Sequence, residues 1–114
     1  MFRLNKKDLI GINREIGCNG KIHNEDSLDY ALHIVNQNKS WLNELCHIVR
    51  SLLVDHAFGD GNKRTAISVI MTYYEYHNLN FDKDRLIKIV WNISKKNVGD
   101  INKLMRLMKN AIIP

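Results

Sequence analysis

The sequence predicts an all-α fold, a compact bundle of about six helices around a central buried helix. Apolar residues recur at the three- and four-residue spacing of one helix face in six segments, and residues that favour helix starts precede most of them. No segment alternates apolar and polar residues over the length of a strand, and the only proline is Pro114. We therefore expect residues 1–114 to form a single domain with one core.

The first predicted helix covers approximately residues 6–16. Asn5 precedes it as a candidate N-cap, and Gly17 and Gly20 follow it, where a glycine commonly ends a helix. The face predicted to point inward carries Leu9, Ile12 and Ile16.

The second predicted helix begins after Asn24. Glu25 and Asp26 favour a helix start there because acidic side chains interact well with the positive end of the helix dipole. The polar run of residues 36–39 ends the helical pattern. The inward face carries Leu28, Ala31, Leu32 and Val35.

The third segment has the clearest helical pattern, with Ser40 as its candidate cap. Its apolar face consists of Trp41, Leu45, Ile48, Val49, Leu52 and Leu53. One further step of four residues along that face reaches His56. We therefore expect His56 at the end of a buried helix face, pointing toward the loop that follows.

The fourth predicted helix, residues 62–77, is apolar around much of its circumference, which is typical of a central helix. Asp82 and Asp100 are candidate caps for the fifth and sixth helices, which residues 97–99 separate. The inward faces carry Leu86, Ile89, Val90 and Ile93 in the fifth helix and Ile101, Leu104, Met105, Met108 and Ile112 in the sixth.

The composition is that of an ordinary globular protein, with 45% hydrophobic and 25% charged residues. The N-terminus has no long apolar run, so we expect neither a signal peptide nor a membrane span, and a cytoplasmic location is the default. Cys18 and Cys46 lack the spacing of a metal site, which favours reduced structural thiols. The net charge of +5 is compatible with nucleic acid, but the cations are scattered, and a phosphate-bearing ligand or an acidic partner explains it equally well.

The central segment 56–66, His-Ala-Phe-Gly-Asp-Gly-Asn-Lys-Arg-Thr-Ala, combines residue types that packing alone does not require. Gly59 and Gly61 allow the backbone to bend sharply and a ligand to approach it closely. The helix that follows begins at Asn62 or a neighbour, and its first amides have no partners within the helix. The sequence therefore predicts an anion site at this helix start.

Phosphoryl or nucleotidyl transfer needs phosphate donors, a metal ion and a base, and this segment offers each. The backbone amides of Gly61, Asn62 and Lys63 are candidates for a phosphate nest. Asp60 is a suitable magnesium ligand, and His56 is a candidate base for an incoming hydroxyl. Arg64 can donate two hydrogen bonds to a phosphate, and Lys63 adds a second positive charge.

Each residue also has a purely structural interpretation. His56 can be a core histidine, and Asp60 a turn residue. Phe58 is best interpreted as a core anchor for the loop. Asn62 and Thr65 can serve as caps, and Lys63 and Arg64 can form a solvated helix face. The other histidines, His23, His33, His47 and His77, carry no functional signal in the sequence.

The segment resembles the signature of the Fic/Doc family, and within it the Doc (death on curing) toxin branch. Weaker similarity extends to Ile12–Asn13, Gly17, Gly20, Leu28, Ala31 and Leu32, and to Asp100–Leu104. The resemblance implies a Fic/Doc-like helical bundle over residues 1–114, with ATP and Mg2+. It assigns the catalytic role to His56, nucleotide binding to Gly61, Asn62, Lys63 and Arg64, and the metal to Asp60.

Two positions distinguish the branches of the family. Family members that transfer AMP carry glycine where this chain has Lys63 and a second arginine where it has Ile67. The resemblance thus implies a kinase, which transfers the terminal phosphate of ATP to a protein hydroxyl, by analogy a threonine of the translation elongation factor that delivers aminoacyl-tRNA. AMP transfer, an inactive interaction module and a nucleic-acid binder remain alternatives.

The resemblance also bears on partners. The inhibitory Ser/Thr-x-x-x-Glu-Gly/Asn pattern of many Fic proteins is missing from the sequence, so a separate antitoxin is expected, as in Doc toxin–antitoxin modules. The segment Asn36 to Ser40 is short for the flap that family members use to hold a target by strand addition.

Overall fold

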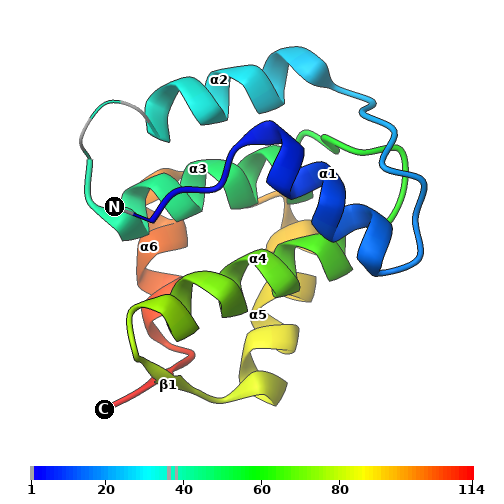
Figure 1. Cartoon of the computed structure of the whole chain (residues 1–114). Coiled ribbons are helices and arrows are strands. Elements are labelled where there is room, and N and C mark those ends of the chain that lie inside the picture. The colour runs from blue at the N-terminus through cyan, green and yellow to red at the C-terminus, as the bar shows by residue number, and fades with distance from the viewer. Residues whose placement is uncertain (1, 36, 38) are drawn as a thin grey trace.

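The computed structural model describes residues 2–35, 37 and 39–114, and these residues form six helices and one very small sheet (Figure 1). The sheet is an antiparallel pair of two-residue strands that places Asn80 opposite Ile113. The helical bundle confirms the predicted all-α fold. The elements are α1 (Lys6–Glu15), α2 (Glu25–Val35), α3 (Trp41–Leu53), α4 (Asn62–Tyr76), β1 (Asn80–Phe81), α5 (Lys83–Lys96), α6 (Ile101–Lys109) and β2 (Ile112–Ile113).

The predicted caps fix the starts of four helices. The side chains of Asn5, Ser40, Asp82 and Asp100 each accept a hydrogen bond from the backbone amide three residues further on. At α1 the arrangement is a full capping box, because the Asp8 carboxylate also accepts the Asn5 amide. Each of these four predicted N-caps is therefore confirmed by its own side-chain hydrogen bond.

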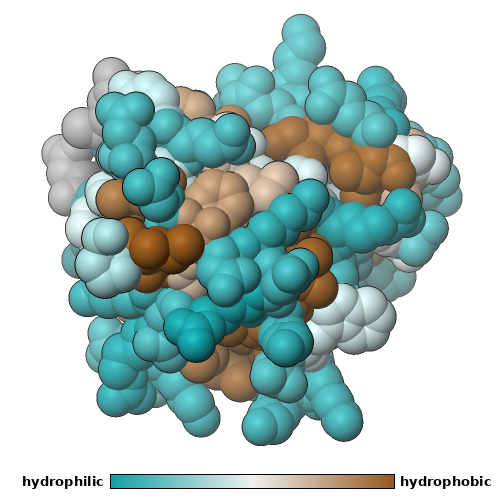
Figure 2. Space-filling model, turned by 90° about the horizontal axis from the view of Figure 1, so that it is seen from below, coloured by the Kyte–Doolittle hydropathy of each residue, from teal (hydrophilic) through white to brown (hydrophobic). Residues whose placement is uncertain are grey.

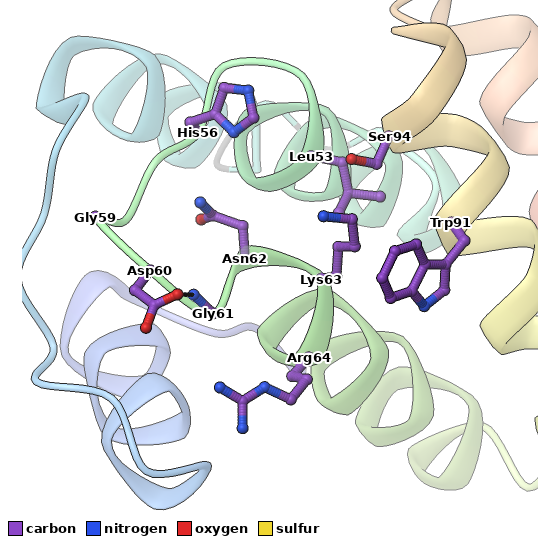
Figure 3. Close-up of a pocket in the computed structure, with 10 residues that line it drawn as sticks. All are labelled: Leu53, His56, Gly59, Asp60, Gly61, Asn62, Lys63, Arg64, Trp91 and Ser94. Carbon is purple, nitrogen blue, oxygen red and sulfur yellow. Dashed lines mark hydrogen bonds between the residues drawn. The ribbon is translucent and has the colours of Figure 1, made fainter.

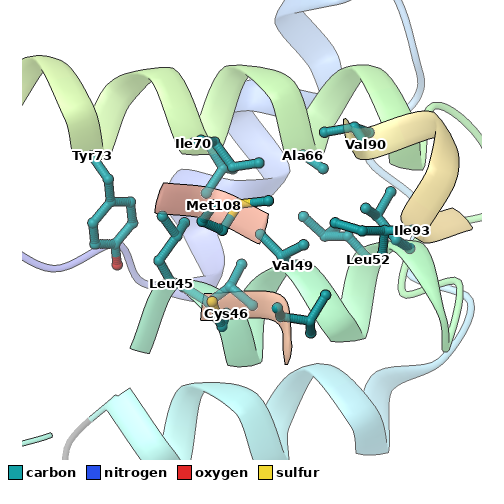
Figure 4. Close-up of a cluster of buried hydrophobic side chains, with 14 of the residues drawn as sticks. Leu45, Cys46, Val49, Leu52, Ala66, Ile70, Tyr73, Val90, Ile93 and Met108 are labelled. Carbon is teal, nitrogen blue, oxygen red and sulfur yellow. The ribbon is translucent and has the colours of Figure 1, made fainter. Parts of the chain in front are cut away.

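The core lies between α3 and α4 and extends to α5 and α6 (Figure 4). Helix α4 is flanked by α1, α3 and α5, as expected of a central helix, and α3 shares the centre because it is buried along most of its length. Helix α2 packs on the outer side of α3 (Figure 1). Fully buried side chains of α3 and α4 include Leu45, Ile48, Leu52, Leu53, Ile70, Tyr73 and Tyr74.

Two sequence predictions are wrong at helix ends. The third helix ends at Leu53, so His56 does not continue its buried face: it is exposed and its backbone is left-handed, with φ of 52°. The sixth helix ends at Lys109, and Ile112 pairs with Phe81 in the sheet instead of extending the helical face. Residues 36 and 38, in the predicted break between α2 and α3, lie outside the described residues.

The face shown in Figure 2 is mainly hydrophilic, and its hydrophobic side chains form separate small areas. Within the described residues, no helix combines the length and the apolar character needed to span a bilayer. The tyrosines near the end of α4 differ in burial: Tyr73 and Tyr74 are buried, and Tyr76 is exposed.

Candidate functional site

A pocket of about 340 Å³ lies at the start of α4, between the loop that follows α3 and one face of α5 (Figure 3). Helix α5 contributes Trp91 and Ser94, and α3 contributes Leu53 at its end. The residues predicted to form a functional site all border this pocket: His56, Asp60, Gly61, Asn62, Lys63 and Arg64.

The loop between α3 and α4 is held by a short antiparallel bridge between Ile22 and Phe58. The Gly59 amide donates to the Lys21 carbonyl oxygen at 3.0 Å. Phe58 is 1% exposed, which confirms it as the core anchor of the loop. These contacts hold the backbone in place on both sides of Phe58, so the edge of the pocket that Gly59 forms is fixed.

Asn62 closes the loop from the other side. Its amide side chain accepts a hydrogen bond from the Phe58 N–H at 3.0 Å and donates one to the Phe58 carbonyl at 2.9 Å. It does not cap α4, because Gly61 occupies the N-cap position. Asn62 thus shapes the loop and leaves the first amides of the helix open.

Asn13, a buried residue of α1, connects three segments of the chain through its side chain. Its Nδ2 donates to the Asp60 carbonyl oxygen at 3.0 Å and to Thr65 Oγ1 at 3.1 Å. Its Oδ1 accepts the Gly20 amide at 2.9 Å. Asn13 is only 1% exposed, and both its Nδ2 and its Oδ1 have hydrogen-bond partners. The side chain therefore fixes the loop and α4 to α1.

Gly61 has a φ of +74°, which is the left-handed region that favours glycine. A Cβ atom at this position would lie 2.4 Å from Cys18 Sγ. Both the backbone angle and the close approach of Cys18 therefore require glycine here. Cys18 was not expected beside the loop, since nothing in the sequence relates it to residue 61.

The start of α4 is open to an anion. The first bond of the helix runs from the Thr65 amide to the Gly61 carbonyl at 2.9 Å, no side chain caps the helix, and its first turn carries no acidic residue. The three preceding amides therefore point out of the helix without a partner among the described residues. Open amides at the positive end of the helix dipole are the arrangement that the predicted anion site requires.

The two cations next to this helix start point in different directions (Figure 3). Lys63 Nζ lies 4.8 Å from the centre of the Trp91 ring, a cation–π contact at the edge of the pocket. The Arg64 guanidinium donates to the Ile16 carbonyl oxygen at 3.1 Å and lies 3.7 Å from Cys18 Sγ. Lys63 is thus close to the pocket interior, whereas Arg64 binds the end of α1.

The acidic and basic candidates lie on the loop itself. The Asp60 carboxylate accepts the Gly61 amide at 2.8 Å and remains exposed to solvent. The exposed His56 imidazole borders the pocket and makes no side-chain hydrogen bond to any of the described residues. The side chain is therefore available to a ligand, contrary to the interpretation of His56 as a core histidine.

The described residues include no group of three or more His, Cys, Asp or Glu side chains that could hold a metal ion by themselves. Asp60 alone fits a magnesium ion only if the other ligands are water and phosphate oxygens, which is the usual arrangement for magnesium bound with a nucleotide. Both cysteines are free, and burial raises the pKa of the Cys46 thiol to about 12, which makes it an inert core residue.

The sequence did not reveal the contribution of α5. Trp91 follows the inward-facing Val90 and is 56% exposed, so helical spacing alone assigns it to the surface. Only the packing of α5 on α4 brings its ring to Lys63. An exposed tryptophan on a polar face was the one available signal.

No family model, no curated protein and no solved structure matches this chain.

Proposed function

We propose that the chain is an ATP-dependent protein phosphotransferase of the Doc type. One observation supports this most strongly: the loop of residues 56–61 and the uncapped start of α4 enclose one pocket that offers amides, a lysine, a carboxylate and an imidazole. Phosphoryl transfer relies on this set of groups, since positioning and charge do most of its work. The resemblance of the segment 56–66 to the Doc signature points to the same activity.

In this proposal the amides of Asn62 and Lys63 bind phosphate oxygens, and the Lys63 ammonium moves from Trp91 onto them. Asp60 would hold magnesium together with the phosphates, and the metal would supply positive charge that neutralises them. Arg64 either leaves the Ile16 carbonyl for the phosphates or keeps the glycine turn in place from its present position.

The chemistry assigned to His56 is proton removal. The hydroxyl oxygen of the target protein attacks the γ-phosphorus, and the imidazole takes the hydroxyl proton. The bond between the γ-phosphorus and the bridging oxygen breaks, and ADP leaves with that oxygen. By resemblance the acceptor is a threonine of a translation elongation factor, and a separate antitoxin restrains the activity.

Radiolabelled ATP tests the reaction directly. The protein is incubated with a cell extract and with ATP labelled at either the γ or the α position. We expect label on protein only from γ-labelled ATP, because Lys63 and Ile67 replace the residues typical of AMP transfer. Label transferred from the α position alone would instead establish the AMP transferase alternative.

His56→Ala tests the proton transfer. We expect a fall in transfer of about 100-fold or more, the usual contribution of a general base, and relief of growth arrest in cells that express the protein. His33→Ala is the matched control, since His33 is an exposed histidine of α2 outside the pocket. Equal arrest by the wild type and His56→Ala would rule out this imidazole as the base.

Thermal unfolding with ATP and Mg2+ separates an enzyme from an inactive module. A ligand that binds only the folded state stabilises it, by about 2.7 kcal/mol at a concentration 100 times its Kd. We expect the melting temperature to rise with ATP and magnesium together. No rise would favour a module that has kept the fold without the nucleotide, and a salt-dependent gel shift would identify a nucleic-acid binder.

A further inference from the structure

Trp91 is a large aromatic side chain at the edge of the pocket with no part in the chemistry described above. Its side chain is 56% exposed on α5, although tryptophan is usually well covered. The Lys63 ammonium lies over its ring, 4.8 Å from the ring centre. A flat aromatic surface therefore adjoins the anion site at the start of α4.

The pocket has two different ends, as Figure 3 shows. The His56 imidazole borders it on the side of the loop, and the Trp91 indole borders it on the side of α5. Asn62 and Lys63, at the open start of α4, lie between them. A ligand with a flat end and a phosphate end matches this order.

We propose that Trp91 is the base-stacking surface of the site, which makes the ligand a nucleoside triphosphate held by its base on α5 and by its phosphates on α4. This inference rests on the proposed function and adds to it the contact that holds the base. Stacking on an aromatic side chain suits any nucleobase because each base has a π face. The phosphate-binding amides alone do not distinguish a nucleotide from other polyphosphates.

Lys63 connects the two halves of the ligand. While its ammonium lies over Trp91, it covers part of the ring. Its transfer to the phosphates uncovers that surface for the base. The same side-chain movement thus prepares both contacts, and base and phosphate binding should support each other.

The arrangement also fixes the direction of the ligand. With the base on Trp91, the α-phosphate is nearer to α5, and the terminal phosphate extends toward the His56 side of the pocket. The imidazole can then take the proton of a hydroxyl that attacks the γ-phosphorus, and not of one that attacks the α-phosphorus. Base stacking on Trp91 is therefore a structural argument for phosphate transfer over AMP transfer, independent of the residue at position 67.

Binding of ATP and of inorganic tripolyphosphate, each with Mg2+, to the whole protein tests the proposal by calorimetry. In the wild type we expect ATP to bind more tightly than tripolyphosphate. In Trp91→Ala, ATP affinity should fall about tenfold, which is about 1.4 kcal/mol, while tripolyphosphate affinity changes less than threefold. Trp91→Phe should restore most of the ATP affinity, because a phenyl ring still stacks.

Tyr30→Ala is the matched control, since Tyr30 is 54% exposed on α2 and does not border the pocket. It should leave both affinities unchanged. Tryptophan fluorescence gives a second readout in the Trp41→Phe background, where Trp91 is the sole tryptophan of the chain. ATP should change the Trp91 emission to saturation with the same Kd as calorimetry.

Three results would overturn the inference. Equal losses of ATP and tripolyphosphate affinity in Trp91→Ala would show that Trp91 only supports the fold of the site. Unchanged ATP affinity in that variant would show that the base lies elsewhere. Both results leave the phosphotransferase proposal intact, whereas a wild type that binds neither ligand would contradict the proposed function itself.

Discussion

Gly61 is the residue on which the shape of the site depends most directly. Its left-handed backbone turns the chain from the loop into α4, and Cys18 Sγ fills the space in which a side chain would stand. A residue with a Cβ atom would have to strain the backbone and displace Cys18 together. The amides of the helix start would then move away from the pocket.

We predict that Gly61→Ala destabilises the protein by about 1–3 kcal/mol, because an unfavourable backbone angle and a steric clash combine. Urea unfolding measures the change. Gly59→Ala is the loop control, since its φ is not left-handed and the nearest atom to a Cβ there is the Lys21 carbonyl oxygen at 3.9 Å. A Gly61→Ala protein as stable as Gly59→Ala would contradict this account of the turn.

Gly11 provides the opposite case within the same molecule. It lies inside α1, and a Cβ atom there would meet no atom within 4 Å. We predict that Gly11→Ala stabilises the protein by about 0.5–1 kcal/mol, since alanine loses less backbone freedom in a helix. The same urea measurement applies, and a loss of stability would show that α1 needs flexibility at this position.

The Lys63 ammonium can lie over Trp91 or on a bound phosphate, and the strengths of these two interactions decide which position it takes. A cation–π contact at an exposed site is worth about 0.5–1 kcal/mol, while a hydrogen bond to a charged group is worth about 1.5–3 kcal/mol. Phosphate can therefore compete with Trp91 for the ammonium. The contact with Trp91 is the state expected without ligand.

At the scale of elements, the site depends on how α1 is joined to the start of α4. The buried Asn13 side chain makes this connection through its bonds to the Asp60 carbonyl and to Thr65 Oγ1, and it also accepts the Gly20 amide from the segment after α1. Removing the side chain leaves the Gly20 amide and the Asp60 carbonyl without these partners. A buried polar group that loses its hydrogen-bond partner destabilises the folded state, whereas an exposed one forms a hydrogen bond with water instead.

We predict that Asn13→Ala lowers the free energy of unfolding by about 2–4 kcal/mol and weakens the ATP binding proposed above, because the loop loses its attachment to α1. Asn102→Ala, an exposed change in α6, should alter stability by less than about 0.5 kcal/mol. Chemical unfolding and ATP titration of both variants provide the comparison. Equal stabilities would mean that packing alone holds α1 against α4.

The sequence predicts the helix starts well because capping is local. Asp82 and Asp100 each act on an amide three residues away, so no knowledge of the fold is needed. The residues of the candidate site, His56 to Arg64, are neighbours in the chain, so the sequence alone can group them, and the pocket that they border contains them all except Ala57 and Phe58. Their common pocket follows from one loop and one helix start.

The helix ends and the contacts between elements were not predictable in this way. Helix α3 stops at Leu53 because the Ala57 amide turns back to the Ser51 carbonyl and Phe58 enters the core. Helix α6 stops early because the chain after it pairs with β1. The contact of Lys63 with Trp91 depends on how α5 crosses α4, which no local pattern encodes.

At the scale of the whole molecule, the +5 charge and the buried charges have different consequences. Most cations lie on the surface, where salt screens them, so they favour an acidic ligand or partner without deciding the fold. Glu44 is different, because it is a carboxylate of α3 that is 2% exposed. Its Oε1 lies 3.6 Å from the Arg3 guanidinium, which ties the N-terminal segment to the core.

Burial raises the pKa of Glu44 above its ordinary value of 4.5, and Arg3 offsets this only in part. The folded state therefore binds this proton more tightly than the unfolded state. The stability that the proton contributes is complete below the unfolded pKa and is lost as the pH rises through the folded pKa. His47 has the opposite effect on how stability changes with pH, because burial lowers its pKa and the charge of Arg50 lowers it further.

Glu44→Gln isolates the contribution of the carboxyl, because His47 is present in both proteins and cancels in the comparison. We predict that the melting temperature of the variant minus that of the wild type increases from pH 4 to pH 7, as only the wild type loses a proton at this site. Calorimetric melting at several pH values gives the difference. A difference that stays constant or shrinks with rising pH would mean that Arg3 outweighs burial, and that the ion pair stabilises the charged carboxylate at the core of the bundle.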